Sequence, residues 1–372
     1  MKRKIQIFSV FIVVKLLLLS CSLVTPRAED NQYKNKFHHL WSKNNDPVHA
    51  TGNLPIALNS PMAHEGIVYV GHNSGRMMAY DLENGRKVWS VEEKGTHHGT
   101  PTAFKDQVIY GNVQGRVLSR HYITGKLKYS VDLGASVEAA GVVYRDRIFF
   151  HLRNHQIFCL DVETGKVLWA YKRSVPYTTT LQRASKPLLH NNKLYVGTAD
   201  GNVLAFNMED GVVLWESKIT NGNKFIDVDT TPVLIGEKLL VGSLSGNLTL
   251  LSASTGQILR SFPYSVARSP VKIGDNFLFG TTNGELILTD VEMNELKRLE
   301  ISHSAISSII RWKGHFAISN VNGELFLVDE KKFTVLDFLQ LGHVSSAVFG
   351  EMVVQAGKLV VLSSRNRLYI FN

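Results

Sequence analysis

The chain has 372 residues, 44% of them hydrophobic and 20% charged, which is typical of a globular protein and not of a disordered one. The formal net charge is +9, but no basic block with interleaved aromatic residues is present, so a nucleic-acid-binding surface is not expected. The length exceeds that of an ordinary single domain and is compatible with one domain built from repeated units.

The first 20 residues are predicted to be a signal peptide. A basic start, Met1–Lys4, precedes an apolar run too short to span a bilayer, and the residues Leu-Leu-Leu-Leu-Ser then lead to Cys21. This ending resembles the lipobox of bacterial lipoproteins, which implies cleavage before Cys21, acylation of Cys21 and a lipidated tether over residues 21–36. Lys15 is an unusual charge in the apolar region, and a plain secretory signal without acylation is the alternative.

A repeated pattern begins near residue 37 and continues to the end of the chain. Each unit has a short strand entered through a small residue and often Pro, a second strand, a turn with Gly, a third strand, a second turn with Gly, and a fourth strand that often contains Trp. Glycine suits these turns because hairpin connections require positive φ. Alternation typical of strands dominates, and no stretch has a sustained helical period.

The turn between the second and third strands marks each unit. Its first residue occurs eight times, at Gly71, Gly111, His151, Gly197, Gly242, Gly280, Ser319 and Ser363. The spacing of 38 to 46 residues is that of four-stranded propeller blades. The predicted fold is therefore all-β: an eight-bladed β-propeller with antiparallel blades over residues 37–372.

The two ends of the chain carry complementary parts of one blade. The last unit has only three strands, near residues 352–355, 358–363 and 367–371, while residues 37–42 resemble a fourth strand with Trp at its close. We therefore expect the N-terminal strand to complete the last blade, which removes an open sheet edge. An open solenoid or two sandwich domains would not need these complementary ends.

The two longest units are consecutive and flank the fourth blade, because their extra residues lie in connections between blades. All such connections emerge on one face of a propeller, so the two enlarged loops should be neighbours and are predicted to be a partner-binding site. The first loop, residues 171–185, presents Lys172, Arg173, Tyr177, Leu181, Gln182 and Arg183, and the second, residues 220–230, presents Asn223, Lys224, Phe225, Asp227 and Asp229. Aromatic and cationic anchors beside paired carboxylates suit a protein surface.

Structural roles are the alternative for these residues. Asp229 precedes Thr230, Thr231 and Pro232, so its carboxylate could cap backbone N–H groups at the start of a strand. Leu181 and Arg183 could instead cover apolar atoms of their own loop.

The blade ending Leu160-Asp161-Val162-Glu163-Thr164-Gly165-Lys166-Val167-Leu168-Trp169 resembles the pyrroloquinoline-quinone-like propellers, and the stretch Asp227-Val228-Asp229-Thr230-Thr231-Pro232-Val233 resembles the BamB family of lipoproteins. The resemblance implies a lipid-anchored scaffold on the periplasmic side of the outer membrane, within the β-barrel assembly machinery. It also implies that Leu181 and the aspartates Asp227 and Asp229 contact the periplasmic repeats of the barrel-forming subunit. The family has Arg where this chain has Gln182, and Arg183 follows one position later.

A quinone-dependent oxidoreductase of the same propeller superfamily is the alternative function. Such enzymes use a Ca²⁺ cage and commonly adjacent cysteines, whereas Cys159 is the only cysteine besides Cys21 and stands where other blades have Ala79 and Ala205. The pairs His38-His39 and His97-His98 cannot chelate together, because neighbouring side chains in a strand point opposite ways. We therefore expect no enzyme activity, no cofactor and no metal, and interpret Cys159 as buried packing. A lipoprotein sensor or adhesin with another partner is a third option.

Overall fold

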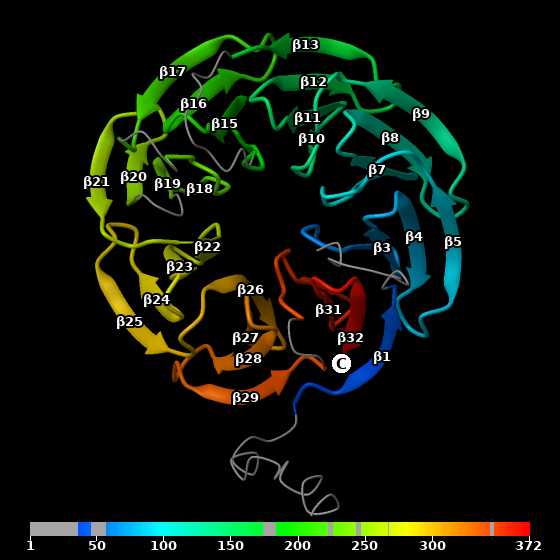
Figure 1. Ribbon diagram of the computed structural model, residues 1–372. Coiled ribbons are helices and arrows are strands. Elements are labelled where there is room, and N and C mark those ends of the chain that lie inside the picture. The colour runs from blue at the N-terminus through cyan, green and yellow to red at the C-terminus, as the bar shows by residue number, and fades with distance from the viewer. Residues whose placement is uncertain are drawn as a thin grey trace, which may run out of the picture. The chain divides into compact units, whose positions relative to one another are not determined.

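The computed structural model describes residues 36–45, 57–173, 184–221, 226–242, 247–266, 268–342 and 346–372. Within these ranges the unit Lys36–Asn372 forms eight four-stranded antiparallel sheets arranged as the blades of a propeller (Figure 1). The predicted fold class is confirmed. No helix occurs in these ranges, and so none that could cross a membrane.

Each of the first four blades runs outward in chain order from its innermost strand. Blade 1 contains β2 (Met62–His64), β3 (Ile67–Gly71), β4 (Arg76–Asp81) and β5 (Lys87–Glu92), and blade 2 contains β6 (Thr102–Phe104), β7 (Gln107–Gly111), β8 (Arg116–His121) and β9 (Leu127–Asp132). Blade 3 contains β10 (Val142–Tyr144), β11 (Arg147–His151), β12 (Ile157–Asp161) and β13 (Val167–Tyr171), and blade 4 contains β14 (Leu188–His190), β15 (Lys193–Gly197), β16 (Asn202–Asn207) and β17 (Val213–Lys218).

The next three blades repeat this order, and the last blade combines both ends of the propeller. Blade 5 contains β18 (Val233–Ile235), β19 (Lys238–Val241), β20 (Leu248–Ser252) and β21 (Ile258–Phe262), and blade 6 contains β22 (Val271–Ile273), β23 (Asn276–Gly280), β24 (Glu285–Thr289) and β25 (Glu295–Glu300). Blade 7 contains β26 (Ile306–Trp312), β27 (His315–Asn320), β28 (Glu324–Asp329) and β29 (Val335–Gln340), and blade 8 contains β30 (Val353–Gln355), β31 (Lys358–Leu362), β32 (Arg367–Phe371) and β1 (His39–Asn44).

The ring closes through β1, as predicted. β1 pairs antiparallel with β32, with Trp41 opposite Ile370 and Asn44 opposite Arg367, and the amide of Asn372 donates to the carbonyl of His38 at 2.7 Å. Phe37, just before β1, is 3% exposed and joins the core between blades 7 and 8. The closing strand therefore contributes both backbone hydrogen bonds and a buried side chain.

The recurring Trp and Gly of the sequence pattern meet each other between neighbouring blades. Trp89 of β5 donates from Nε1 to the carbonyl of Tyr122 at 2.8 Å and covers Gly125 of blade 2, where a Cβ would lie 2.9 Å from the ring. Gly125 has φ +68, so both its backbone conformation and the close contact favour glycine. The same pairing recurs for Trp41 with Gly85, Trp169 with Gly211 and Trp215 with Gly256. These four contacts attach blade 8 to blade 1, blade 1 to blade 2, blade 3 to blade 4 and blade 4 to blade 5 at the outer rim.

Candidate functional site

The two enlarged connections run from β13 to β14 and from β17 to β18, on either side of blade 4. Both lead from an outermost strand to the innermost strand of the next blade, so they emerge on the same face, as predicted. Their tips lie outside the described residues, and with them Tyr177, Leu181, Gln182 and Arg183. Cys21 also lies outside them. The bases of both loops are described, and they reveal how the loops are attached.

Arg173 anchors the base of the first loop. Its Nε lies 2.9 Å from Asp200 Oδ2, and its Nη2 and Nη1 lie 2.7 and 3.1 Å from the two carboxylate oxygens of Glu216. The side chains of Arg173 and Asp200 are each 14% exposed. Burial alone would raise the pKa of Asp200, but hydrogen bonds from Thr198 and Arg173 outweigh it and lower that pKa below its ordinary value. Arg173 is therefore a structural clamp, whereas the sequence indicated a cation presented to solvent.

Backbone contacts hold the second loop against the same blade. Thr220 donates from its hydroxyl to the carbonyl of Ile226 at 2.7 Å, which closes the base of the loop across residues 222–225. The amide of Val228 donates to the carbonyl of Thr198 at 3.1 Å, and the Val228 side chain is buried between blades 4 and 5. The start and the end of this loop therefore have defined positions on blade 4.

The two predicted aspartates of this loop have different environments. Asp227 is 3% exposed, so the expectation that it is presented on the surface is wrong. Its charge acts on His155. Burial lowers the pKa of His155 below its ordinary value, and the negative charges of Asp200 and Asp227 offset part of that decrease. Asp229 is half-buried and lines a pocket of about 190 Å³ on the propeller axis. Of the pair, only Asp229 has its side chain at a surface that a partner could reach.

His151 connects blade 3 to the chain that leads into β14. It is fully buried, and its Nδ1 lies 2.9 Å from the carbonyl of Ser185. Burial, together with the neighbouring His155, lowers the pKa of His151 to about 3. The imidazole is therefore neutral at physiological pH and serves as a hydrogen-bonding spacer between the blades.

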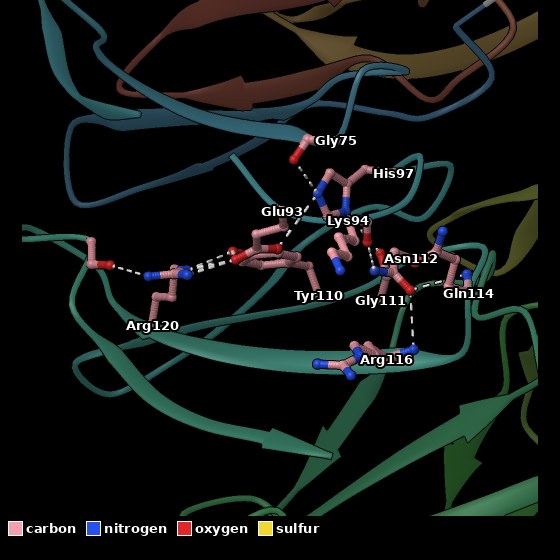
Figure 2. Close-up of polar contacts among 11 residues, drawn as sticks. Gly75, Glu93, Lys94, His97, Tyr110, Gly111, Asn112, Gln114, Arg116 and Arg120 are labelled. Carbon is pink, nitrogen blue, oxygen red and sulfur yellow. Dashed lines mark hydrogen bonds and ion pairs between the residues drawn. The ribbon is translucent and has the colours of Figure 1, made fainter. Parts of the chain in front are cut away.

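A second polar cluster lies between blades 1 and 2 (Figure 2). Glu93 Oε1 accepts hydrogen bonds from the Tyr110 hydroxyl at 2.9 Å and from Arg120 Nε at 2.8 Å, and Glu93 Oε2 lies 3.6 Å from His97 Nε2. The two ring nitrogens of His97 also lie 3.2 Å from the carbonyls of Gly111 and Gly75. His97 is fully buried, and burial is the main cause of its lowered pKa. The types of residue suggest acid–base chemistry, but their contacts are with one another and with the backbone.

Cys159 and the pair His97-His98 have the environments that the sequence predicts. Cys159 is completely buried, and burial raises the pKa of its thiol to about 12, so it has little nucleophilic character. His97 is in the interior while its neighbour His98 lines the axial pocket, as expected for adjacent residues of extended chain. Within the described ranges, no group of three or more His, Cys, Asp or Glu side chains could hold a metal ion.

A family profile and two relatives that resemble the chain in sequence all belong to the same family. The family profile described as "Outer membrane protein assembly factor BamB" matches residues 38–120 and 79–295. The BamB of Shewanella oneidensis is 23% identical over 333 residues, covering 84% of this chain and 83% of that protein. The BamB of Yersinia pestis is also 23% identical and covers 82% and 81% of the two chains.

Solved structures share the propeller. The crystal structure of BamB from Moraxella catarrhalis superposes with a TM-score of 0.77 at 17% identity, covering 90% of this chain and 99% of that one. A europium-containing methanol dehydrogenase superposes with a TM-score of 0.69 at 12% identity, covering 87% and 84%. At these identities the structural likeness establishes the fold, and enzymes and assembly factors both use it.

Proposed function

This chain belongs to the BamB family of outer membrane protein assembly factors, and from that premise we propose that it is a non-catalytic, protein-binding component of the β-barrel assembly machinery at the outer membrane. The observation that carries the proposal is the family match over residues 38–295, together with relatives of that name that cover more than four-fifths of the chain. The oxidoreductase alternative has the common propeller in its favour, but the methanol dehydrogenase that shares it is only 12% identical, which supports the fold alone.

The partner-binding surface is the face that carries the two enlarged loops. Arg173, Asp200 and Glu216 fix the base of the first loop, and Thr220 closes the base of the second, so both loops start from a rigid blade. Preorganised loops lose less conformational freedom on binding, which favours affinity. We assign contacts with the periplasmic repeats of the barrel-forming subunit to Tyr177, Leu181, Gln182, Arg183 and Asp229. Buried Asp227 supports the loop from inside.

Charge reversal at Asp229 tests this surface. The variant Asp229→Lys should reduce co-purification of the barrel-forming subunit by about tenfold, because it removes the carboxylate and puts a charge of opposite sign in its place, and a tenfold loss corresponds to ~1.4 kcal/mol. The measurement is the ratio of the two proteins after affinity purification of this chain from membranes solubilised in detergent, with thermal unfolding showing that the propeller is intact.

Asp275→Lys is the matched control. Asp275 is exposed in the turn between β22 and β23, which lies on the opposite face because successive turns of an antiparallel blade alternate between faces. It should leave the ratio unchanged. Equal recovery of the subunit by Asp229→Lys and wild type would contradict the assigned surface. A purification that recovers other partners in its place would favour the sensor or adhesin function.

We further propose that Cys21 carries the lipid that holds the chain at the outer membrane, on its periplasmic side. Cys21→Ser should then move most of the protein from the membrane pellet to the soluble periplasmic fraction, because acyl chains supply the membrane affinity. Fractionation with immunoblotting checks this, with Cys159→Ala as the control that keeps the anchor. Persistence of Cys21→Ser in the membrane fraction of cells without the barrel-forming subunit would contradict acylation.

A further inference from the structure

One position recurs in every blade at the axis of the propeller. It lies four residues before the last residue of the innermost strand, just where the chain arrives at the axis. Seven of the eight residues at this position line the same axial pocket of about 190 Å³. From blade 1 to blade 8 they are Ser60, Thr100, Ala140, Lys186, Thr231, Ser269, Ser308 and Glu351.

Six members of this axial ring are small and two are charged. Blades 4 and 8 stand four apart in the ring of eight, on opposite sides of the axis (Figure 1). Lys186 belongs to blade 4 and Glu351 to blade 8, and both line the axial pocket. Both are exposed to solvent within the pocket. Neither side chain forms an ion pair with any residue in the ranges that the structure describes. The pocket therefore has an ammonium group on one blade and a carboxylate on the opposite blade, with hydroxyl-bearing residues among the rest of its lining.

The other charges at the pocket nearly cancel. Asp229 and Arg268 also line it, and each is engaged in interactions of its own, including a hydrogen bond from Arg268 to the carbonyl of Phe349. Glu138 is paired with Arg153 at 3.2 Å and accepts from Ser136 at 2.8 Å. Burial lowers the pKa of His98, so this side chain adds no charge near neutral pH. The ligand that suits such a pocket carries both charges and no net charge.

We propose that the axial pocket binds a small zwitterion of the amino-acid or short-peptide class, with its carboxylate on Lys186 and its ammonium group on Glu351. Hydrogen bonds with a charged donor or acceptor are stronger than neutral ones, and two at opposite ends fix the orientation of the ligand. Ser60, Thr100, Thr231 and Ser269 offer hydroxyls to a peptide group between the ends. A pocket of about 190 Å³ is below the ~300 Å³ at which sites for larger ligands begin, which favours a ligand of this size.

Titration calorimetry of the purified residue 22–372 protein with glycine, glycylglycine and triglycine tests the proposal, since the three differ in the separation of their charged ends. We expect saturable 1:1 binding for at least one of them. N-acetylglycylglycine lacks the ammonium group and glycylglycine amide lacks the carboxylate, so both should bind at least tenfold more weakly than the best zwitterion. Stronger binding of glycine than of the peptides would identify free amino acids as the ligand source, and the reverse would identify peptides.

Variants taken from the repeat itself should leave the fold intact. Lys186→Ser and Glu351→Thr introduce residues that other blades carry at this position, and each should raise the dissociation constant at least tenfold. The charge-swapped double variant Lys186→Glu/Glu351→Lys should bind within threefold of wild type, because the ligand can reverse its direction. Lys166→Ser, which removes an exposed lysine from an outer turn, should have no effect. Thermal unfolding of each variant confirms its fold.

Absence of saturable binding for all three zwitterions would overturn the proposal. So would binding that Lys186→Ser and Glu351→Thr leave unchanged, or blocked analogues that bind as well as the free zwitterion. The charge-swapped variant separates recognition of two charges from a general electrostatic effect of either residue.

Discussion

Removal of residues 22–45, and with them the closing strand β1, should abolish cooperative folding of the propeller. The deletion takes away the antiparallel pairing of β1 with β32 and leaves the edge of β32 open to other chains. It also removes Phe37, which stacks on Trp312 at 5.7 Å between ring centroids and meets Phe371 edge-on at 5.8 Å. We expect an aggregating product without a sharp thermal transition.

The free energies of the contacts that the deletion removes support so large an effect. Burying one Phe side chain contributes about 1.5–3 kcal/mol, and Trp41 adds a hydrogen bond from Nε1 to the carbonyl of Leu82 at 2.9 Å and packing on Gly85. The amides of Lys36 and Phe37 also donate to the carboxylate of Asp337, which is 3% exposed and would be left without these donors. These losses together approach the ~5–15 kcal/mol that stabilises a typical domain.

A circular permutation tests whether the propeller needs β1 as a strand or needs it at the N-terminus of the chain. The amide of Asn372 bonds to the carbonyl of His38, so a short turn can join the end of the chain to the start of β1. A protein that begins at residue 57 and carries residues 37–45 after Asn372, through a five-residue turn copied from residues 82–86, should regain a cooperative transition by circular dichroism. Cooperative unfolding of the simple deletion, equal to that of wild type, would show that β1 does not close the ring.

The ring and its closure could be predicted from the sequence because their causes are local and repeated. Turn glycines such as Gly75, Gly115 and Gly125 have positive φ, four of the turn glycines lie against a Trp of the preceding blade, and these residues return at nearly constant spacing. The incomplete last unit could then be matched with the strand near Trp41. The prediction of the ring therefore did not depend on any single contact between blades.

The candidate site was predicted less well because its contacts are long-range and occur once. Arg173 is 27 residues from Asp200 and 43 from Glu216, and no repeat relates these positions. Asp227 is buried and its charge acts on His155 in the turn of blade 3, a relation that alternation along the loop could not indicate. The charged residues Lys186 and Glu351 were not predicted as a site, because their places on opposite blades follow only from the ring geometry.

Mild acid should destabilise this propeller through its buried histidines. Burial lowers the pKa of His151 from 6.5 to about 3, so below pH 6.5 the unfolded chain binds a proton that the folded chain does not. The free energy of unfolding therefore falls as the pH falls from 6.5 toward 3, and is unaffected by this residue above pH 6.5. Between pH 6.5 and 5, where most carboxylates stay ionised, the loss from His151 should be roughly 2 kcal/mol. His97 and His155, whose pKa values are also lowered by burial, act in the same direction.

Urea unfolding at several pH values between 7 and 5 measures this dependence, and a pair of variants assigns it. His151→Asn keeps a donor near the carbonyl of Ser185 but does not titrate, so the decrease between pH 6.5 and 5 should be smaller than in wild type by roughly 2 kcal/mol, whatever the stability at pH 7. His303→Asn removes a histidine whose side chain is 94% exposed, and should keep the wild-type slope. If His151→Asn kept the full slope, the imidazole of His151 would have to accept its proton in the folded state, which its burial and the neighbouring His155 oppose. The comparison therefore tests whether the buried imidazole of His151 stays neutral in the folded propeller.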